Sequence, residues 1–345
     1  MIWMGLGVSG QKQQREIAGT AFFISLLAAT SLIILFGTAL AGTETGEFCP
    51  DCPDWTNLDG WYAQKESYEN SMLSPSPPVE QNMPNSQAQA ESNTIEDKSA
   101  DYPVASILTR ANLIESDRVI LDVRSIQEYQ EGHIPGARNL YWKDLQRDGV
   151  LDPILAQEAL GRAGIIASDR LLIYGDSSDH GAPFVFWALS YLGHEDISLL
   201  DGGIDAALNA GLDLSANAPS IAPTNYTSHV VPGLLVTPES LDDMLGLSDV
   251  SILDARDFSE YGKNRITNEA MPLSLDRIYK DSGIKDASIL EDLFGSRLDE
   301  SGTAVVYGTP EAYSLFFSLR LMGYNATLLE GDWWKETRWA VSNVK

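Results

Sequence analysis

Apolar residues occur in short runs that alternate with longer amphipathic stretches from Tyr102 onward. The runs at 118–124 (RVILDVR), 171–175 (LLIYG) and 197–203 (ISLLDGG) have the length of strands and end in polar residues or glycine. The stretch at 181–193 (GAPFVFWALSYLG) has the length and apolar spacing of a helix. Strands that alternate with helices form βαβ units. The pattern therefore predicts an α/β fold with mainly parallel sheets flanked by helices.

The same order of elements returns in the second part of the chain. Apolar runs at 251–256 (SILDAR), 304–308 (AVVYG) and 326–331 (ATLLEG) predict strands, and 310–323 (PEAYSLFFSLRLMG) predicts a helix. In both parts a tyrosine ends the middle strand, just before a loop that leads into the helix. This self-similarity is typical of a duplicated domain.

One long apolar run precedes these elements. Residues 17–41 carry no charged side chain, and a helix of that length crosses a bilayer. Lys12 and Arg15 come before the run, so we expect the amino terminus in the cytoplasm and the rest outside the cell membrane. The small residues that end at Ala41 leave open a cleaved signal and a secreted protein.

These patterns predict the organisation of the whole chain. Residues 1–41 form the membrane anchor or signal, and 42–100 form an exported CxxC tract and a disordered linker. The stretch at 72–101 is rich in Pro, Ser, Gln, Asn and acid. Two repeated domains follow, at 101–215 and 232–345. The residues between them are rich in Pro, Ser and Asn and lack an aliphatic period.

Charge and cysteine content narrow the function classes. The net charge is −26, from 49 Asp and Glu against 23 Lys and Arg. Nucleic-acid binding needs a basic surface, so this class of partner is excluded. The chain has only two cysteines, Cys49 and Cys52, and both lie in the linker. A disulfide framework therefore does not hold the two domains together.

Several motifs of the two domains resemble those of a known family. The first domain contains LDVR, GHIPGA and LLDGG, and the second keeps LDAR. These motifs resemble the signatures of rhodanese domains, and the tandem order resembles the two-domain thiosulfate and mercaptopyruvate sulfurtransferases. The polar and glycine residues that carry the resemblance are Asp122, Arg124, His133, Asp201, Gly202, Asp254 and Arg256.

A structural role is expected for most of these motif residues. Arg124 lies two residues after Asp122 at a predicted strand end, so it can pair with Asp122 or with Glu128 and fix the following turn. His133 lies at a predicted bend, where a histidine more often satisfies backbone groups than binds a ligand.

The residue that the resemblance requires for catalysis is missing. The family transfers sulfur through a cysteine thiolate at the start of the loop after the tyrosine-ending strand. Gly308 occupies that place in the second domain and Gly175 in the first, and Thr309 has no adjacent base. We therefore expect both loops to lack this activity. The other residues of these degenerate loops are Thr309, Glu311 and Ser314 in the second, and Asp176, Ser177, Asp179 and His180 in the first.

The first loop also has an alternative chemistry. Asp176, Asp179 and His180 offer oxygen and nitrogen atoms of the kind that bind a divalent cation. The competing interpretation is that the three side chains cap the turn and are solvated. We expect no cofactor in the two domains.

The CPDC tract is the chain's only thiol chemistry, and four interpretations remain open. Cys49 and Cys52 can form a local disulfide, or can supply half of a metal site that a second chain completes. They can instead act as a redox or sulfur-carrying pair, or link two chains by disulfides.

The leading functional hypothesis is an exported, membrane-anchored rhodanese-like module that binds or scaffolds and does not transfer sulfur at its loops. The alternative is a thiosulfate-type sulfurtransferase or sulfur carrier that uses Cys49 or Cys52. A third hypothesis is a metal- or disulfide-linked dimer through the same cysteines. The expected partner is a protein or a small sulfur compound, together with the membrane through 17–41.

Overall fold

A computed structural model describes residues 101–177, 179–281, 283–336 and 341–342, which belong to one compact unit. The predicted anchor at 17–41, the linker at 42–100 and the CPDC tract lie outside the described residues. Within the described ranges, no helix is both long and apolar enough to cross a membrane.

The first part of this unit is built on a parallel sheet. In the residues described, five strands lie in the order β1-β7-β6-β2-β3, and every neighbouring pair is parallel. The strands are β1 (Leu108–Thr109), β2 (Val119–Asp122), β3 (Arg138–Asn139), β6 (Leu171–Tyr174) and β7 (Ile197–Leu200). The helices of this part are α2 (Ile126–Glu131), α3 (Pro153–Arg162), α4 (Gly181–Tyr191) and α5 (Gly203–Asn209). The predicted strands and helix of the first part are thus confirmed.

The second part repeats this order. Its described sheet has four strands in the order β10-β8-β13-β14, again all parallel. They are β8 (Val250–Asp254), β10 (Met271–Pro272), β13 (Thr303–Tyr307) and β14 (Asn325–Leu328). The accompanying helices are α6 (Pro238–Met244), α7 (Phe258–Lys263), α8 (Ala287–Gly295) and α9 (Glu311–Leu321), and a further ladder joins β9 (Asn264–Arg265) to β15 (Val341–Ser342). The strands and helix predicted here are also found.

Local sequence explains where the helices that flank the motifs begin. Ser125 accepts a hydrogen bond from the backbone N–H of Glu128, whose carboxylate accepts from the Ser125 N–H in return, so α2 starts with a capping box. Asp152 caps α3, and a proline follows in the first turn. In contrast, α4 and α9 are apolar on nearly every side, which is the pattern of buried helices.

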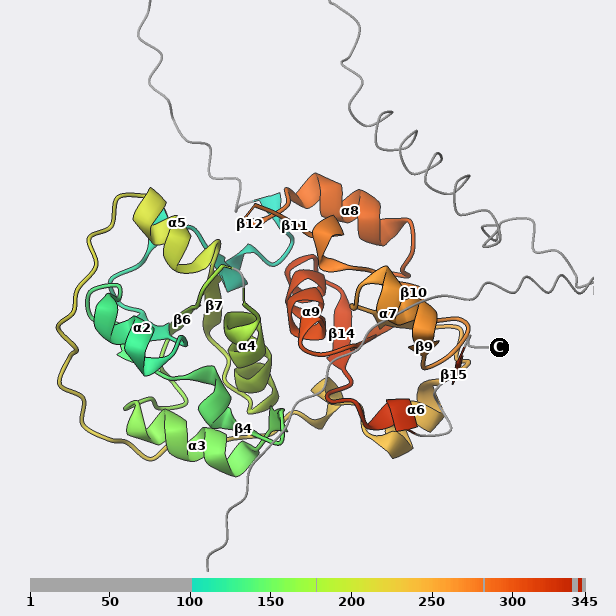
Figure 1. Cartoon of the computed structure of the whole chain (residues 1–345), viewed down its shortest axis with the longest axis horizontal. Helices are drawn as coiled ribbons and strands as arrows, with labels where there is room; N and C mark the ends of the chain where they lie inside the picture. Colours follow the sequence, from blue (N-terminus) through green and yellow to red (C-terminus); the bar gives the residue numbers. More distant parts are fainter. Residues whose placement is uncertain (1–100, 178, 282, 337–340, 343–345) are drawn as a thin grey trace, which may run out of the picture. The chain divides into compact units, whose positions relative to one another are not determined.

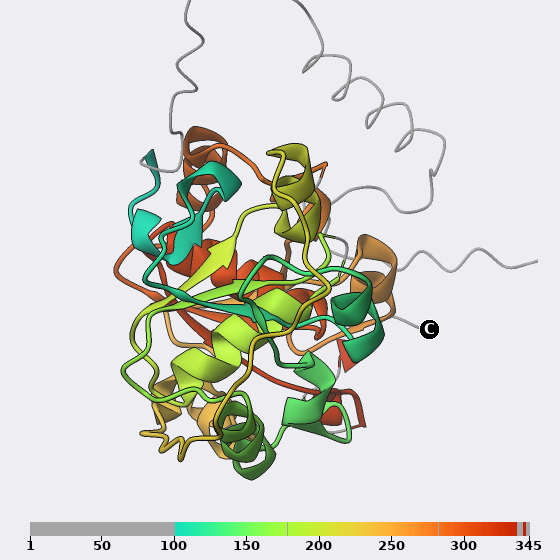
Figure 2. The same cartoon turned by 90° about the vertical axis from the view of Figure 1, so that its left-hand side faces the viewer.

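Those two buried helices join the parts into one core. The α4 ring of Phe186 lies 5.0 Å from that of Phe317 in α9, edge to face, and Trp187 lies 5.5 Å from Tyr313. Figure 1 shows α4 and α9 side by side between the two sheets, and in Figure 2 the first part lies in front of the second. Buried residues of both sheets belong to a single hydrophobic cluster. The two parts therefore form a continuous core.

Each part contains a short hairpin that contacts the other part. The first is β4–β5 (Gln146–Arg147 and Val150–Leu151), and the second is β11–β12 (Tyr279–Lys280 and Gly283–Ile284). The N–H of Leu151 donates to Glu330 Oε1 at 2.8 Å, and the N–H of Ile284 donates to Asp201 Oδ1 at 3.1 Å. Asp201 and Glu330 each follow the last strand of their own sheet. The two parts thus exchange equivalent contacts.

Candidate functional site

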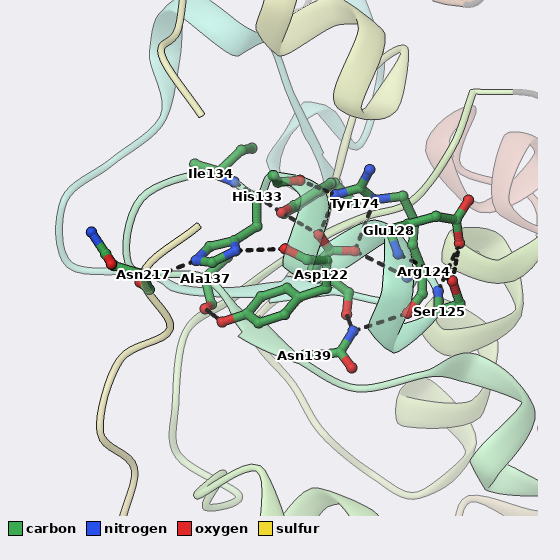
Figure 3. A network of polar contacts seen from close by, with 12 residues as sticks. Asp122, Arg124, Ser125, Glu128, His133, Ile134, Ala137, Asn139, Tyr174 and Asn217 are labelled. Atoms are coloured by element: carbon green, nitrogen blue, oxygen red, sulfur yellow. Dashed lines mark hydrogen bonds and ion pairs between the residues drawn. The ribbon is translucent and has the colours of Figure 1, made fainter. Parts of the chain in front are cut away.

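The Asp-x-Arg motif forms a buried ion pair at the end of β2. Arg124 Nη2 lies 2.6 Å from Asp122 Oδ2, and Arg124 Nε donates to Asp122 Oδ1 at 3.0 Å. The Tyr174 hydroxyl donates to the same carboxylate at 2.6 Å, and Arg124 also donates to the Gly132 carbonyl. Figure 3 shows this network between the strand end, α2 and the following bend. The predicted pair is confirmed, and both side chains make their hydrogen bonds with other groups of the protein.

His133 is part of the same structural framework. Its side chain is fully buried, and Nδ1 lies 2.8 Å from the Tyr129 carbonyl oxygen. The imidazole stacks on the Tyr129 ring at 3.9 Å between centroids. Since the ring is enclosed and hydrogen-bonded, His133 is a packing residue of the bend, as predicted.

The second part repeats the ion pair and places it against the loop glycine. Arg256 Nη2 lies 2.6 Å from Asp254 Oδ2. A Cβ atom at Gly308 would lie 2.5 Å from Arg256 Cγ and 3.2 Å from Asp254 Oδ1. Gly308 also has a φ of +90°, a region that strains other residues. The backbone here has no room for a cysteine side chain.

Gly175 has different surroundings in the first loop. A Cβ there would meet Val123 Cγ2 at 3.3 Å and Asp179 Oδ1 at 3.4 Å, and Gly175 does not have a positive φ. The first loop therefore tolerates a small side chain with slight adjustment, whereas the second does not.

The remaining predicted residues of the second loop lie at different places. Glu311 lies in the first turn of α9, after Thr309 and Pro310. Ser314 is buried, and its Oγ lies 3.2 Å from Nδ1 of His180 in the first loop. The sequence analysis assigned Ser314 to the second loop, whereas the structure places its hydroxyl beside His180 of the first loop.

A cavity of about 320 Å³ lies beside the first loop. Residues predicted from the sequence line one side: Gly175, Asp176, Ser177, Asp179, His180, Asp201 and Gly202. Residues of the second part line the other, including Asp276, Tyr279, Asp281, Ser314 and Phe317. The volume is within the range of small-molecule sites, at its lower end.

Burial perturbs the titration of the groups around this cavity. Burial, and then the charge of Glu128, raises the pKa of Asp176 to about 6. Burial also raises the pKa of Asp179 and of Asp201. It lowers the pKa of His180, which favours the neutral imidazole. The cavity therefore combines carboxylates of raised pKa with a histidine of lowered pKa.

The first-loop residues do not assemble a cluster for a divalent cation. Asp179 Oδ1 accepts from the Gly181 N–H at 2.8 Å, while His180 Nδ1 faces Ser314 and Ser177 Oγ donates to Asp205. In the part of the chain that the structure describes, no three His, Cys, Asp or Glu side chains are grouped as a metal site. The capping interpretation holds for Asp179.

The sequence analysis did not predict that residues of the second part line the first-loop cavity. Tyr279 and Asp281 belong to the β11–β12 hairpin, which was not predicted. A signal was present, since LQRDGVL at 145–151 and IYKDSGI at 278–284 occur at equivalent places in the two parts. Both contain an aspartate followed by a glycine within two residues, which is typical of a tight turn.

Comparison with known proteins identifies the fold. The rhodanese-like domain family matches residues 109–210. The thiosulfate sulfurtransferase of Pseudomonas aeruginosa is 33% identical over 156 residues, covering 43% of this chain and 57% of the relative. A probable 3-mercaptopyruvate sulfurtransferase of the same organism is 33% identical over 168 residues, with 42% and 58% covered. The chain thus spans little more than half of these relatives.

Comparison with solved structures also identifies the rhodanese fold. The 3-mercaptopyruvate sulfotransferase SseA from Escherichia coli aligns with a TM-score of 0.59 at 19% identity, covering 66% of this chain and 99% of SseA. At this identity the likeness concerns the fold. The described unit has the rhodanese fold, with parallel sheets flanked by helices, and residues 109–210 match its family.

Proposed function

We propose that this chain is a binding or scaffold protein on the rhodanese fold, without cysteine-dependent sulfur transfer at either loop. The proposal rests on the second loop, which has no cysteine and is crowded at Gly308. Arg256 Cγ lies 2.5 Å from the place that a Cβ of residue 308 would take, and the only cysteines of the chain are Cys49 and Cys52. The loop lacks both the nucleophile and the space for it.

No other side chain of the second loop takes over this chemistry. Sulfur transfer through a persulfide needs a thiolate, because sulfur–sulfur exchange proceeds by thiolate attack. Ser314 carries a hydroxyl, which lies 3.2 Å from His180 Nδ1 in the lining of the first-loop cavity. The same absence argues against cysteine-dependent phosphatase chemistry.

We also propose that the unit consists of two tandem rhodanese-like domains. The two sheets share a strand order in which the Asp-x-Arg strand lies beside the tyrosine-ending strand. The exchanged contacts of Leu151 with Glu330 and of Ile284 with Asp201 support a two-fold relation between the parts.

The proposed setting is the exterior of the cell membrane. Residues 17–41 would anchor the chain, or would be removed as a signal with cleavage near Ala41. Residues 42–100 would link the anchor to the domains. We propose this setting from the sequence pattern alone.

A second candidate function uses the CPDC tract. The relatives in Pseudomonas aeruginosa are named as sulfurtransferases, and Cys49 and Cys52 are the thiols that this chain retains. In that case the tract would carry sulfur as a persulfide. A metal or disulfide shared between two chains at the same cysteines is the structural variant of this hypothesis.

One assay separates these functions. The full chain, purified in mild detergent, is incubated with thiosulfate and cyanide, and thiocyanate is measured. A Cys49→Ser/Cys52→Ser variant is the matched control. Background rates for both proteins support the binding function, whereas turnover that the variant loses supports the sulfur carrier. Turnover that the variant retains contradicts the proposed loss of sulfur transfer.

A further inference from the structure

The cavity beside the first loop has a definite chemical character. We propose that it binds a small organic cation with an apolar body, such as a primary amine. This inference rests on the proposed binding function, because it assigns a ligand class to a loop that carries no nucleophile. The relevant features are the apolar walls, the sign of the charges around them, and the origin of the walls in both parts of the fold.

Apolar side chains form much of the cavity wall. Leu108 and Leu199 come from the first sheet, and Leu275, Ile284 and Phe317 come from the second part. A hydrated metal ion gains nothing from such walls, whereas an alkyl or aryl group gains free energy by leaving water. The walls therefore favour an organic ligand over an inorganic one.

The charged groups that line the cavity all have one sign. Asp176, Asp179, Asp201, Asp276 and Asp281 line it, and no lysine or arginine is among the described lining residues. Arg110, outside the lining, is 4.0 Å from Asp201. Lys285, also outside it, donates from Nζ to the Asp276 backbone carbonyl at 2.7 Å. An anion would face repulsion from five carboxylates, whereas an ammonium group would supply a counter-charge.

Polar groups also line the cavity. His180 Nδ1 and Ser314 Oγ lie 3.2 Å apart, and burial lowers the pKa of His180, which favours the neutral imidazole. The Tyr279 side chain also lines the cavity and presents an aromatic ring. An ammonium group attached to a small apolar body can meet the carboxylates while the body contacts Tyr279 and Phe317.

The ligand would bridge the two parts of the fold. The first loop and Asp201 belong to the first part, while Asp276, Tyr279 and Asp281 belong to the second. Binding would therefore add to the contact that Ile284 already makes with Asp201. A ligand that binds the folded state in this way raises the unfolding temperature as its concentration increases.

Three probes of similar size and different charge test the proposal. Phenethylamine is a cation at neutral pH, 2-phenylethanol is neutral, and phenylacetate is an anion. Binding of each to the full chain is measured by isothermal titration calorimetry and by the shift in unfolding temperature. The proposal predicts that phenethylamine binds at least tenfold more tightly than the alcohol and that phenylacetate does not bind.

Matched variants place the binding in the cavity. Asp281→Asn removes a carboxylate from the lining of the cavity, and Asp148→Asn makes the same change at the turn of the other hairpin. The two aspartates have nearly equal φ angles, 53° and 54°, so the backbone cost is matched. We expect about two- to fivefold weaker phenethylamine binding for Asp281→Asn. Asp201→Asn should weaken it about tenfold or more, and Asp148→Asn should leave it unchanged.

The outcomes are distinct from those of the thiocyanate assay. Equal binding of the three probes, preference for phenylacetate, or no binding of phenethylamine at millimolar concentration overturns the cation proposal. Phenethylamine binding that Asp281→Asn and Asp201→Asn leave unchanged overturns it as well. Failure of the proposed function appears separately, as thiocyanate formed by the cysteine-free variant, and no amine takes part in that assay.

Discussion

Glu330 makes the stability of this protein depend on pH. Its side chain is buried between the two parts, and Oε1 accepts hydrogen bonds from the Tyr313 hydroxyl at 2.7 Å and the Leu151 N–H at 2.8 Å. Burial raises its pKa from an ordinary 4.5 to about 7, although both hydrogen bonds act in the opposite direction. The folded state therefore holds a proton that the unfolded state releases.

The sign and size of the effect follow by linkage. A raised carboxyl pKa contributes stability that is fully present below pH 4.5 and is lost as the pH rises through 7. Since one pKa unit corresponds to about 1.4 kcal/mol, this single group lowers the free energy of unfolding by about 3 kcal/mol across that range.

Glu330→Gln tests this reasoning, because the amide is neutral at every pH and its Oε1 can still accept both hydrogen bonds. The free energy of unfolding is measured by urea denaturation at several pH values between 4.5 and 8.5. The variant should match the wild type near pH 4.5 and exceed it by about 3 kcal/mol at pH 8.5. Exposed Glu131, changed to Gln, is the control and should follow the wild type. Parallel curves for wild type and Glu330→Gln would refute the argument.

Further substitutions test the two loops and the buried ion pair. Arg124→Ala leaves Asp122 buried without its cation and should lower the free energy of unfolding by about 3–5 kcal/mol in urea; a loss below about 1 kcal/mol would contradict the account. Gly308→Cys must displace Arg256 and strain the backbone, so its melting temperature should fall well below that of Gly175→Cys, and equal melting temperatures would disprove the crowding. Gly308→Cys should also form no thiocyanate from thiosulfate, because its thiol has no room in the loop; turnover would show that the loop opens.

The strands and the buried helices could be predicted because they depend on local patterns. Runs such as LLIYG at 171–175 are bounded by turn residues, and GAPFVFWALSYLG has helical length. The pairing of Asp122 with Arg124 was predictable for the same reason, since the two residues are close in the chain.

The candidate cavity could not be predicted in this way. Its walls join His180 to Ser314, which are 134 residues apart, and Asp201 to Ile284, which are 83 apart. Contacts of this range depend on how α4 and α9 pack, which a one-dimensional pattern does not contain. The crowding at Gly308 has a similar origin, because it comes from the path of the Arg256 side chain.

The central claim is that neither rhodanese loop transfers sulfur, and the thiocyanate assay on the Cys49→Ser/Cys52→Ser variant tests it most directly. In this variant no thiol of the chain remains, so turnover could come only from the loops. The variant is incubated with thiosulfate and cyanide, and thiocyanate is measured against a protein-free blank. The account predicts the rate of the blank, and thiocyanate formation above that rate would contradict it.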